Sequence, residues 1–414
     1  MTDGQRRARL GVRHALAPSA RAGGPAGAAR AVVALHSTDP SSVHVAAWAR
    51  TRDEQADAAS VERALYEDRA LVRLLAMRRT VFVAPVETAA VLQAACSREV
   101  AARERRKLEG FVAASVPAPG GSAAGWLAGA EEAALASLAA RGEATAADLA
   151  ADDPRLAAQV RIGGASRHAR GQSVAARLLL LLAAEGKAVR GRPRGSWTSH
   201  QYRWSPLSAW LPDGLAPWET GAARAELARL WLRAYGPGTA EDLRWWTGWT
   251  KTQTTRALKV VAPAEVELDD GSTGLVLADD LEPVPDPGPW AALLPALDPT
   301  PMGWHSRAWY LGPHQDRLYD RAGNIGPSVW WCGRIVGGWA QDRDGALVCR
   351  YLEDVGADAR AAVDAEAARL APRLGDVRLT ARTRGRTWLE EELAAGSGRR
   401  RGPFSPPPPA PAAR

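Results

Sequence analysis

The stretch LHSTDPSSVHVAAWAR (35–50), followed by SVERALYEDRALVRLLAM (60–77) and TVFVA (80–84), decides the fold. Apolar residues recur at roughly helical spacing in the second segment, and the third is rich in β-branched and aromatic residues. With the Ala-rich residues 26–35 in front, the expected order is helix, turn, helix, helix and strand. This is the order of a winged-helix unit, in which a β-hairpin follows three helices.

The same order occurs twice more along the chain. Residues 131–191 predict a helix, a Gly turn, a short helix capped by Thr145 and a long apolar helix, and residues 187–206 predict a two-stranded wing. Residues 222–280 repeat the helices and the hairpin. We therefore expect an α+β fold built from tandem winged-helix (helix-turn-helix) modules. The predicted modules are residues 1–95, 96–215 and 216–288.

The composition changes after residue 288. Residues 328–352 alternate β-branched and aromatic residues around Gly turns, which predicts hairpins of a small sheet, and residues 355–374 predict a closing amphipathic helix. We expect residues 289–390 to form this C-terminal β-rich element with its helix. The Pro- and Arg-rich residues 391–414 are expected to be disordered. Six tryptophans are expected to pack in the core: Trp245, Trp246, Trp249, Trp330, Trp331 and Trp339.

Charge and cysteine content limit the classes of protein. The chain has 414 residues, and its net charge of +7 permits a polyanion partner without requiring one. Cys96, Cys332 and Cys349 form no CxxC motif, so we expect neither a disulfide framework nor a zinc site. No signal-peptide segment opens the sequence, and the apolar run 174–186 is too short to span a bilayer. We expect a cytoplasmic monomer that needs no metal or other cofactor and no membrane.

Several short motifs, taken in their shared order, carry a resemblance to a known family. They are LHSTDP (35–40), MRRT (77–80), YGPGTAED (235–242), WWTG (245–248), LPALDP (294–299) and IVGGW (335–339). Together they resemble the winged-helix DNA-binding proteins of the AlkZ-like family, which includes the azinomycin-resistance and interstrand-crosslink DNA glycosylases. The resemblance covers roughly residues 5–390.

The resemblance implies a fold and an activity. Tandem winged-helix modules would form a concave, positively lined channel for double-stranded DNA. The implied reaction is hydrolysis of the N-glycosidic bond of bulky or cationic alkylpurine adducts, without a metal. The family carries Gln-x-Gln or Gln-x-Asp, which orients the attacking water, where this chain has His36 and Thr38. It also often has His at the position of Phe82. This chain is thus a His-x-Thr variant.

The chemistry of the reaction assigns possible roles to this turn. An N7-alkylated base is already a cationic leaving group, so the protein must mainly place a water and stabilise oxocarbenium character at the sugar. A neutral His36 can orient water and accept its proton, and Thr38 can hold the same water by its hydroxyl. Asp39 can add negative charge opposite the sugar. The alternative is structural, since Asp39 followed by Pro40 is by itself a helix start.

Two basic segments are the candidate DNA contacts. The predicted wing carries Lys187, Arg190, Arg192 and Arg194, which can lie along a phosphate backbone. The alternative for this segment is a solvated charged loop. Arg78, Arg79 and Thr80 lead into the first strand pair, and their alternative role is to cap a helix C-terminus.

The residues leave two other classes of function open. One is a non-catalytic, regulatory winged-helix DNA-binding protein, and the other is a protein-interaction scaffold. No predicted helix presents an evident set of base-reading side chains. We therefore expect recognition of DNA shape and phosphates, which favours repair over transcription control.

Overall fold

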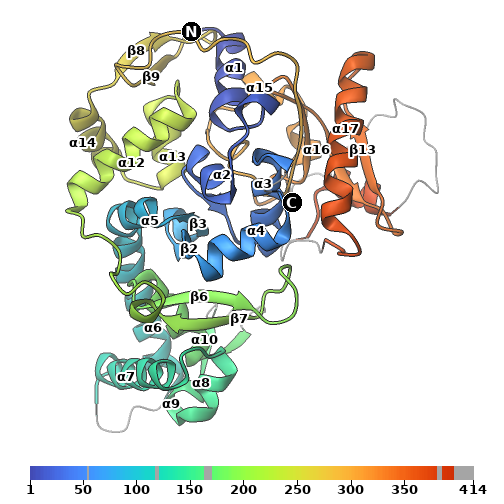
Figure 1. Cartoon of the computed structure of the whole chain (residues 1–414). Helices are drawn as coiled ribbons and strands as arrows, with labels where there is room; N and C mark the ends of the chain where they lie inside the picture. Colours follow the sequence, from blue (N-terminus) through green and yellow to red (C-terminus); the bar gives the residue numbers. More distant parts are fainter. Residues whose placement is uncertain (54–55, 117–120, 163–169, 380–384, 396–414) are drawn as a thin grey trace, which may run out of the picture.

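The computed structural model describes residues 1–53, 56–116, 121–162, 170–379 and 385–395. Figure 1 shows a large upper lobe, which holds both the N-terminal helices and the C-terminal sheet, and a smaller lower lobe, formed by the helices and strands of residues 98–206. Buried apolar side chains form one cluster in each lobe. Leu75 of the first module is buried in the lower cluster, so the two lobes pack against one another.

The first module has the connectivity of a winged helix. β1 pairs with β3 and β3 pairs with β2, both antiparallel, which gives the sheet order β1-β3-β2. Helix α3 begins where the sequence predicts, because Asp39 accepts a hydrogen bond from Ser41 N–H and Pro40 stands at the first helical position. The elements are α1 (Asp3–Arg13), η1 (Pro18–Ala20), α2 (Pro25–Ala31), β1 (Leu35–His36), α3 (Pro40–Arg50), α4 (Ala58–Glu62), η3 (Arg63–Glu67), β2 (Leu71–Leu75), η4 (Met77–Arg79) and β3 (Val81–Pro85).

The prediction of one helix over residues 60–77 was wrong. The helical part ends at Glu67, and β2 occupies Leu71–Leu75, paired with β3 in the register Leu71 to Pro85 and Leu75 to Val81. All five residues of β2 are buried, so the strand shows no alternation of apolar and polar residues. A short apolar run buried on both faces cannot be told from a helix by its spacing.

The second module, in the lower lobe, repeats the connectivity with an insertion. Ala144 pairs with Trp204 of β7, and β7 pairs with β6. Thr145 and Asp148 form the predicted capping box at the start of α8. The elements are α5 (Val86–Leu92), η5 (Gln93–Ser97), α6 (Arg98–Ser115), α7 (Ala123–Arg141), α8 (Ala146–Asp152), α9 (Pro154–Ala157), the inserted hairpin β4 (Gln159–Ile162) and β5 (Arg170–Ser173), α10 (Val174–Ala184), β6 (Ala188–Pro193), β7 (Tyr202–Pro206) and α11 (Leu207–Trp210).

The third module has the same connectivity and shares the upper core. Gly238 pairs with Leu275 of β9, which pairs with β8. The elements are α12 (Thr220–Tyr235), α13 (Ala240–Thr247), α14 (Lys251–Val261), β8 (Ala264–Glu267) and β9 (Thr273–Val276). The module boundaries drawn from the sequence stay a prediction.

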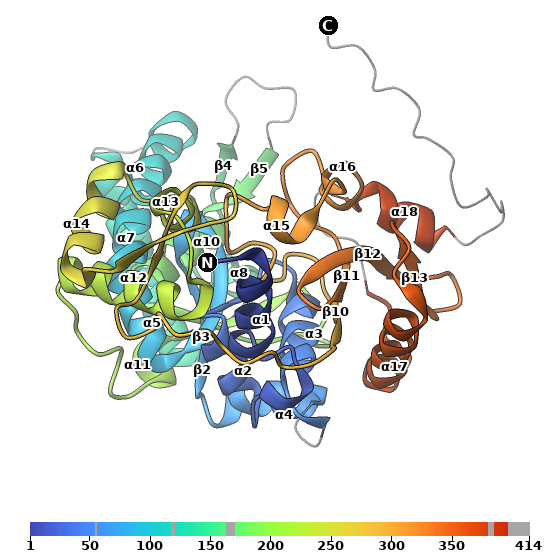
Figure 2. The same cartoon turned by 90° about the horizontal axis from the view of Figure 1, so that it is seen from above.

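A four-stranded antiparallel sheet in the order β10-β11-β12-β13 follows, and Figure 2 shows this sheet and α17 on the side of the molecule opposite α14. Residues 391–394, predicted to be disordered, instead belong to α18, because Thr387 and Glu390 form a capping box that starts this helix. Residues 396–414 lie outside the described residues. The elements are β10 (Ala291–Leu294), α15 (Ala308–Leu311), α16 (Gln315–Leu318), β11 (Ser328–Trp331), β12 (Arg334–Gln341), β13 (Leu347–Tyr351), α17 (Gly356–Leu374) and α18 (Trp388–Ala394).

A fully buried ion pair fastens the first module to the C-terminal region. The Arg50 guanidinium at the end of α3 donates to both carboxylate oxygens of Asp298, at 2.8 and 2.6 Å, and to Thr300 Oγ1 at 2.7 Å. This pairing joins the VHVAAWAR and LPALDP motifs in space. The ion pair lies at the C-terminal end of α3; near the N-terminal end, Ser42 Oγ donates to Ala296 O at 2.7 Å and holds the start of the helix against the same region. Among the described residues, no helix is long and apolar enough to cross a membrane.

Candidate functional site

The LHSTDP turn leaves the edge of the first-module sheet and enters α3. The Ser37 N–H donates to Val81 O at 2.8 Å, which extends the pairing of β1 with β3 by one residue. The next side chain, Thr38, is exposed and lines a cavity. Asp39 is buried, and its Oδ1 accepts from both Ser41 N–H, at 3.0 Å, and Ser41 Oγ, at 2.7 Å. The turn therefore presents Thr38 outward while Asp39 starts the helix.

His36 lies beneath Thr38. Its side chain is buried, with 8% of the residue exposed, and its ring meets Phe82 edge to face at 5.5 Å between centroids. The Thr38 N–H donates to His36 Nδ1 at 3.4 Å, so a neutral His36 in this geometry carries its proton on Nε2. His36 is thus in contact with the backbone of the residue that lines the cavity.

A buried arginine fixes the turn from the other side. The Arg73 Nε–H on β2 donates to Ser37 Oγ at 2.9 Å, and its Nη1 donates to the Tyr66 hydroxyl at 3.0 Å. The Arg73 guanidinium also lies 4.9 Å from the ring centroid of Tyr202, on the wing of the second module. The turn, the first-module sheet and the wing are therefore connected through one side chain.

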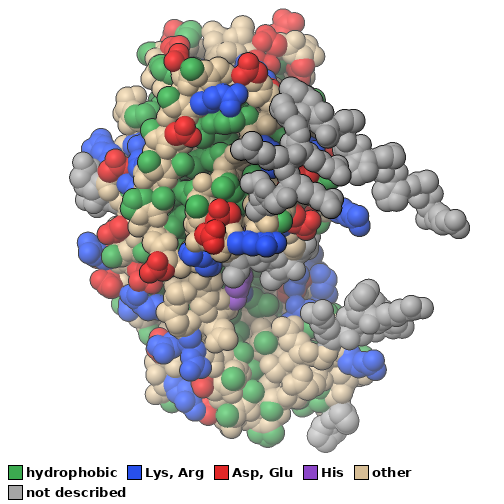
Figure 3. All heavy atoms as spheres, turned by 90° about the vertical axis from the view of Figure 1, so that its right-hand side faces the viewer, with side chains coloured by type: hydrophobic (Ala, Val, Ile, Leu, Met, Phe, Trp, Pro, Cys, Tyr) green, Lys and Arg blue, Asp and Glu red, His purple; other side chains and the backbone are tan. Residues whose placement is uncertain are grey.

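The cavity lies between the first-module sheet and the lower lobe. Its volume is about 690 Å³, and its walls come from β2, η4 and β3 above, α6 and α10 beside, and the start of α8 and the wing below. Figure 3 shows the surface hollowed at the level between the two lobes, with Lys and Arg side chains near the hollow. Much of the lining is apolar: Leu75, Val81, Leu108, Phe111, Leu180, Leu181 and Trp204.

Cations predominate among the charged side chains of the cavity. Five basic residues line it against one carboxylate, Glu104, among the described residues; the five are Arg79, Lys107, Arg177, Arg190 and Arg194. Glu104 bonds to Arg79 at 2.7 Å and to Lys107 at 2.9 Å. Burial acts to raise the pKa of Glu104, but the hydrogen bond from Lys107 and the charge of Arg79 outweigh it and lower this pKa. Glu104 thus stays ionised and neutralises only part of the charge.

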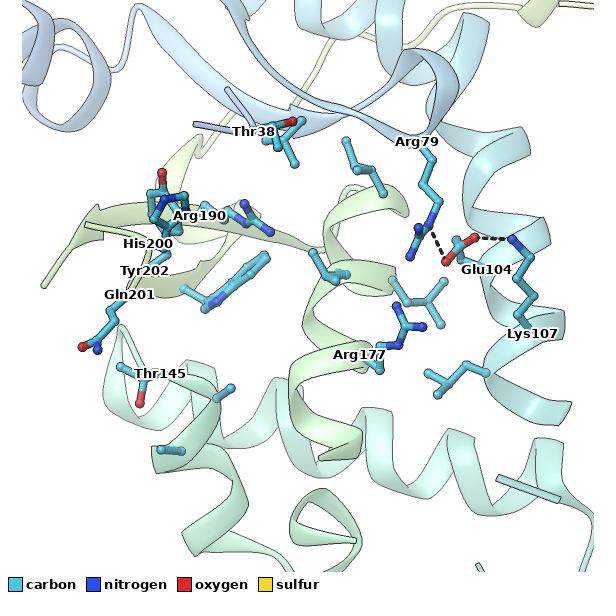
Figure 4. A pocket seen from close by; sticks show the side chains of 18 of the residues that line it. Thr38, Arg79, Glu104, Lys107, Thr145, Arg177, Arg190, His200, Gln201 and Tyr202 are labelled. Atoms are coloured by element: carbon cyan, nitrogen blue, oxygen red, sulfur yellow. Dashed lines mark hydrogen bonds and ion pairs between the residues drawn. The ribbon is translucent and has the colours of Figure 1, made fainter. Parts of the chain in front are cut away.

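Three of the cavity arginines, Arg177, Arg190 and Arg194, form no ion pair with a carboxylate among the described residues. Figure 4 shows Arg79, Arg177 and Arg190 pointing toward one common space from three different elements. Burial, together with nearby Arg79, lowers the pKa of Arg177. Burial lowers the pKa of Arg190 to about 10, and the guanidinium lies 5.1 and 5.0 Å from the ring centroids of Tyr202 and Trp204. An uncompensated cation in a desolvated wall favours binding of an anion.

The structure brings together four of the ten residues selected from the sequence. Thr38, Arg79, Arg190 and Arg194 line the cavity. Lys187 instead forms ion pairs with Glu131 and Glu185, and Arg192 pairs with Glu62 at 2.9 Å and Glu67 at 3.3 Å. His36 and Asp39 lie behind Thr38, and the main chain of Thr80 bonds to Met77 and Ala76. Arg78 points to α13, as described below.

Sequence reasoning did not select Lys107, Arg177, His200, Gln201 and Tyr202, which also line the cavity. One of these residues, Arg177, could have been recognised from the sequence. Arg177 is the single cation within the apolar run 174–184, and a charge on an otherwise buried helix needs an explanation. Among the described residues, no group of three or more His, Cys, Asp or Glu side chains could hold a metal ion.

The cavity lies between two winged-helix-like modules, and its lining is basic. These two features are typical of a protein that binds a polyanion. The model of the family described as DNA glycosylase AlkZ-like matches residues 29–373, so the chain belongs to that family. The solved structure of Streptomyces sahachiroi DNA glycosylase AlkZ aligns with 92% of this chain and 98% of its own, with a TM-score of 0.68 and 21% identity. At that identity the likeness establishes the shared fold. No curated protein sequence matches the chain.

Proposed function

We propose that this protein is a DNA glycosylase that hydrolyses the N-glycosidic bond of alkylated or bulky purines in double-stranded DNA. Family membership supports the reaction class. The observation that carries the proposal is the position of Thr38, exposed in the wall of a cavity that the described residues line with five cations and one carboxylate. The protein is proposed to act as a cytoplasmic monomer, associated with the nucleoid when bound to DNA.

The cavity suits an extruded nucleotide. Enzymes that act on a base take it out of the helical stack and hold it in a pocket. A volume of about 690 Å³ falls within the range of small-molecule sites, roughly 300 to 1,000 Å³. Its apolar lining can pack against a base and its adduct, whereas the cations around it are suited to the flanking phosphates. Arg79, Arg190 and Arg194 are the proposed phosphate contacts within the cavity.

The turn would supply the water. The Thr38 hydroxyl faces the cavity and can hold a water against the anomeric carbon, opposite the departing base. His36 receives the Thr38 N–H on Nδ1, so it positions the backbone that carries this hydroxyl. Asp39, one residue further on, adds negative charge on the side where the sugar becomes cationic. Because an N7-alkylated purine leaves as a neutral base, no strong acid is needed.

An assay of base release tests this proposal. A duplex that carries N7-methylguanine is incubated with the wild-type protein, with Thr38→Ala and with Thr38→Ser, and the released base is measured. We expect release by the wild type, a large loss in Thr38→Ala and recovery in Thr38→Ser, which keeps the hydroxyl. Binding of the duplex without release would favour a non-catalytic DNA-binding protein. In such a protein Asp39 would serve only as the cap of α3, and His36 would be a buried structural residue. Absence of DNA binding would refute both.

A further inference from the structure

Two consecutive arginines at the tip of the β2–β3 hairpin point in different directions. Arg78 and Arg79 have φ angles of 51° and 61°, both in the left-handed region that residues with a Cβ rarely adopt. Arg79 reaches into the cavity and pairs with Glu104. Arg78 instead reaches the α13 helix of the third module. The strained backbone thus places Arg79 on the cavity wall and Arg78 outside the cavity.

Outside the cavity, Arg78 shares a tryptophan with a second arginine. The Arg78 guanidinium lies 4.3 Å from the ring centroid of Trp245, and the Arg307 guanidinium lies 4.7 Å from the same centroid. Arg307 comes from the C-terminal region, so three segments far apart in the sequence meet here. Gly248, which ends α13 at a φ of 74°, leaves room for Arg78, because a Cβ there would lie 2.9 Å from Arg78 Cγ.

This cation pair has no anionic partner among the described residues. No carboxylate oxygen of that part of the chain lies within 4.0 Å of the guanidinium nitrogens of Arg78 or Arg307, whereas Arg244, on the same helix as Trp245, pairs with Glu241 at 2.6 Å. Desolvation by the surrounding protein, together with the charge of Arg307, lowers the pKa of Arg78 to about 10. Arg78 is exposed and Arg307 is half-buried, so an incoming anion can reach this site.

We propose that Arg78, Trp245 and Arg307 form a second phosphate-binding site, which holds the DNA backbone outside the cavity. This inference rests on the proposed function. Guanidinium groups bind phosphate oxygens through two parallel hydrogen bonds, and stacking on an indole orients the planar group for this contact. Arg79 lines the cavity, and Arg78 directly precedes it in the chain. The second site would therefore receive the DNA strand where this strand leaves the cavity. It extends the DNA footprint onto the third module and the C-terminal region.

The test is the salt dependence of duplex binding by the double variant Arg78→Gln/Arg307→Gln. Each phosphate contact contributes about 0.9 to the slope of log affinity against log salt concentration. If each arginine contacts one phosphate, we expect the slope to become less steep by about 1.8, and the affinity at 0.1 M salt to fall about eightfold per lost contact. The assay is fluorescence anisotropy of a labelled undamaged duplex from 50 to 300 mM salt.

Two further variants separate this site from loss of charge and from loss of structure. Arg229→Gln/Arg360→Gln removes the same charge; Arg229 pairs with Glu226, and Arg360 lies 4.9 Å from the Tyr351 ring centroid, as Arg307 lies over Trp245. We expect this control to keep the wild-type slope. Arg78→Lys/Arg307→Lys keeps the charge and should retain most of the slope, which a purely structural role would not explain.

The outcomes distinguish this inference from the proposed function. A wild-type slope in Arg78→Gln/Arg307→Gln, with the wild-type protein binding normally, would overturn the second site and leave the proposed function intact. An equal loss of slope in the Arg229/Arg360 control would overturn it as well, because the effect would then reflect total charge. If the wild-type protein binds no duplex at all, both proposals are refuted.

Discussion

Replacing Arg190 should weaken DNA binding at little or no cost to stability. Burial lowers the pKa of this guanidinium from its ordinary value to about 10, so at pH 7, below both the unfolded and the folded pKa, the charged group destabilises the folded protein by about 3 kcal/mol. Arg190→Met removes that cost and keeps an apolar stem. It also removes the contacts with the Tyr202 and Trp204 rings, each worth about 0.5 to 2 kcal/mol. The net expectation runs from about 2 kcal/mol more stable than the wild type to about 1 kcal/mol less stable.

The same substitution should weaken DNA binding. Loss of one phosphate contact would lower the affinity for a duplex about eightfold at 0.1 M salt and reduce the salt slope by about 0.9. Stability would be measured by urea unfolding at pH 7, and binding by fluorescence anisotropy. The matched control is Arg203→Met on the same hairpin, where the arginine is exposed and pairs with Glu143 at 2.7 Å. This control should change stability by no more than about 1 kcal/mol and leave binding near the wild-type value.

One result would refute the reasoning about Arg190. If Arg190→Met is clearly less stable than the wild type and binds DNA with unchanged affinity and slope, then Arg190 stabilises the wing. Its lack of a carboxylate partner would then have no bearing on ligand binding.

Three further predictions concern the turn and its supports. Asp39→Ala should lower the free energy of unfolding by about 1 kcal/mol, because α3 loses its cap; urea unfolding measures this, and Asp39→Asn, which keeps an acceptor, should lose less. Arg73→Met removes the bond to Ser37 Oγ at 2.9 Å and should slow base release at saturating duplex while duplex affinity stays within about twofold; an equal fall in affinity would show a general loss of folding. Asp298→Ala leaves Arg50 buried without its partner and should cost about 3 to 5 kcal/mol in urea unfolding, whereas an effect below 1 kcal/mol would mean that water compensates the charge.

The sequence predicted those features that depend on neighbouring residues. Asp39 and Pro40 start α3, and Thr145 with Asp148 starts α8, because a cap needs only residues two or three positions apart. The order of motifs predicted the family. The core role expected for the tryptophans is confirmed for Trp246, Trp249, Trp330 and Trp339, which are buried.

Features set by distant contacts could not be predicted. The β2 strand was taken for a helix, because all five of its residues are buried, by elements distant in the sequence that include α10 and β6. Lys187 and Arg192 looked free in the sequence, but their partners Glu131 and Glu62 come from other helices. Trp245 and Trp331 pack against the upper core but are only half-buried, and Trp245 also lies between arginines from two other segments. Such pairings cannot be predicted from neighbouring residues, because the partners lie far apart in the sequence.

The central claim is that the cavity beside Thr38 hydrolyses a glycosidic bond. The most direct measurement is the formation of abasic sites in a duplex containing a single N7-alkylated guanine, with wild-type protein in excess and strand cleavage by alkali as the readout. We predict abasic sites at the modified position at a rate well above spontaneous depurination, and none above background in the unmodified duplex. Tight binding of the modified duplex with depurination at the spontaneous rate would contradict the claim.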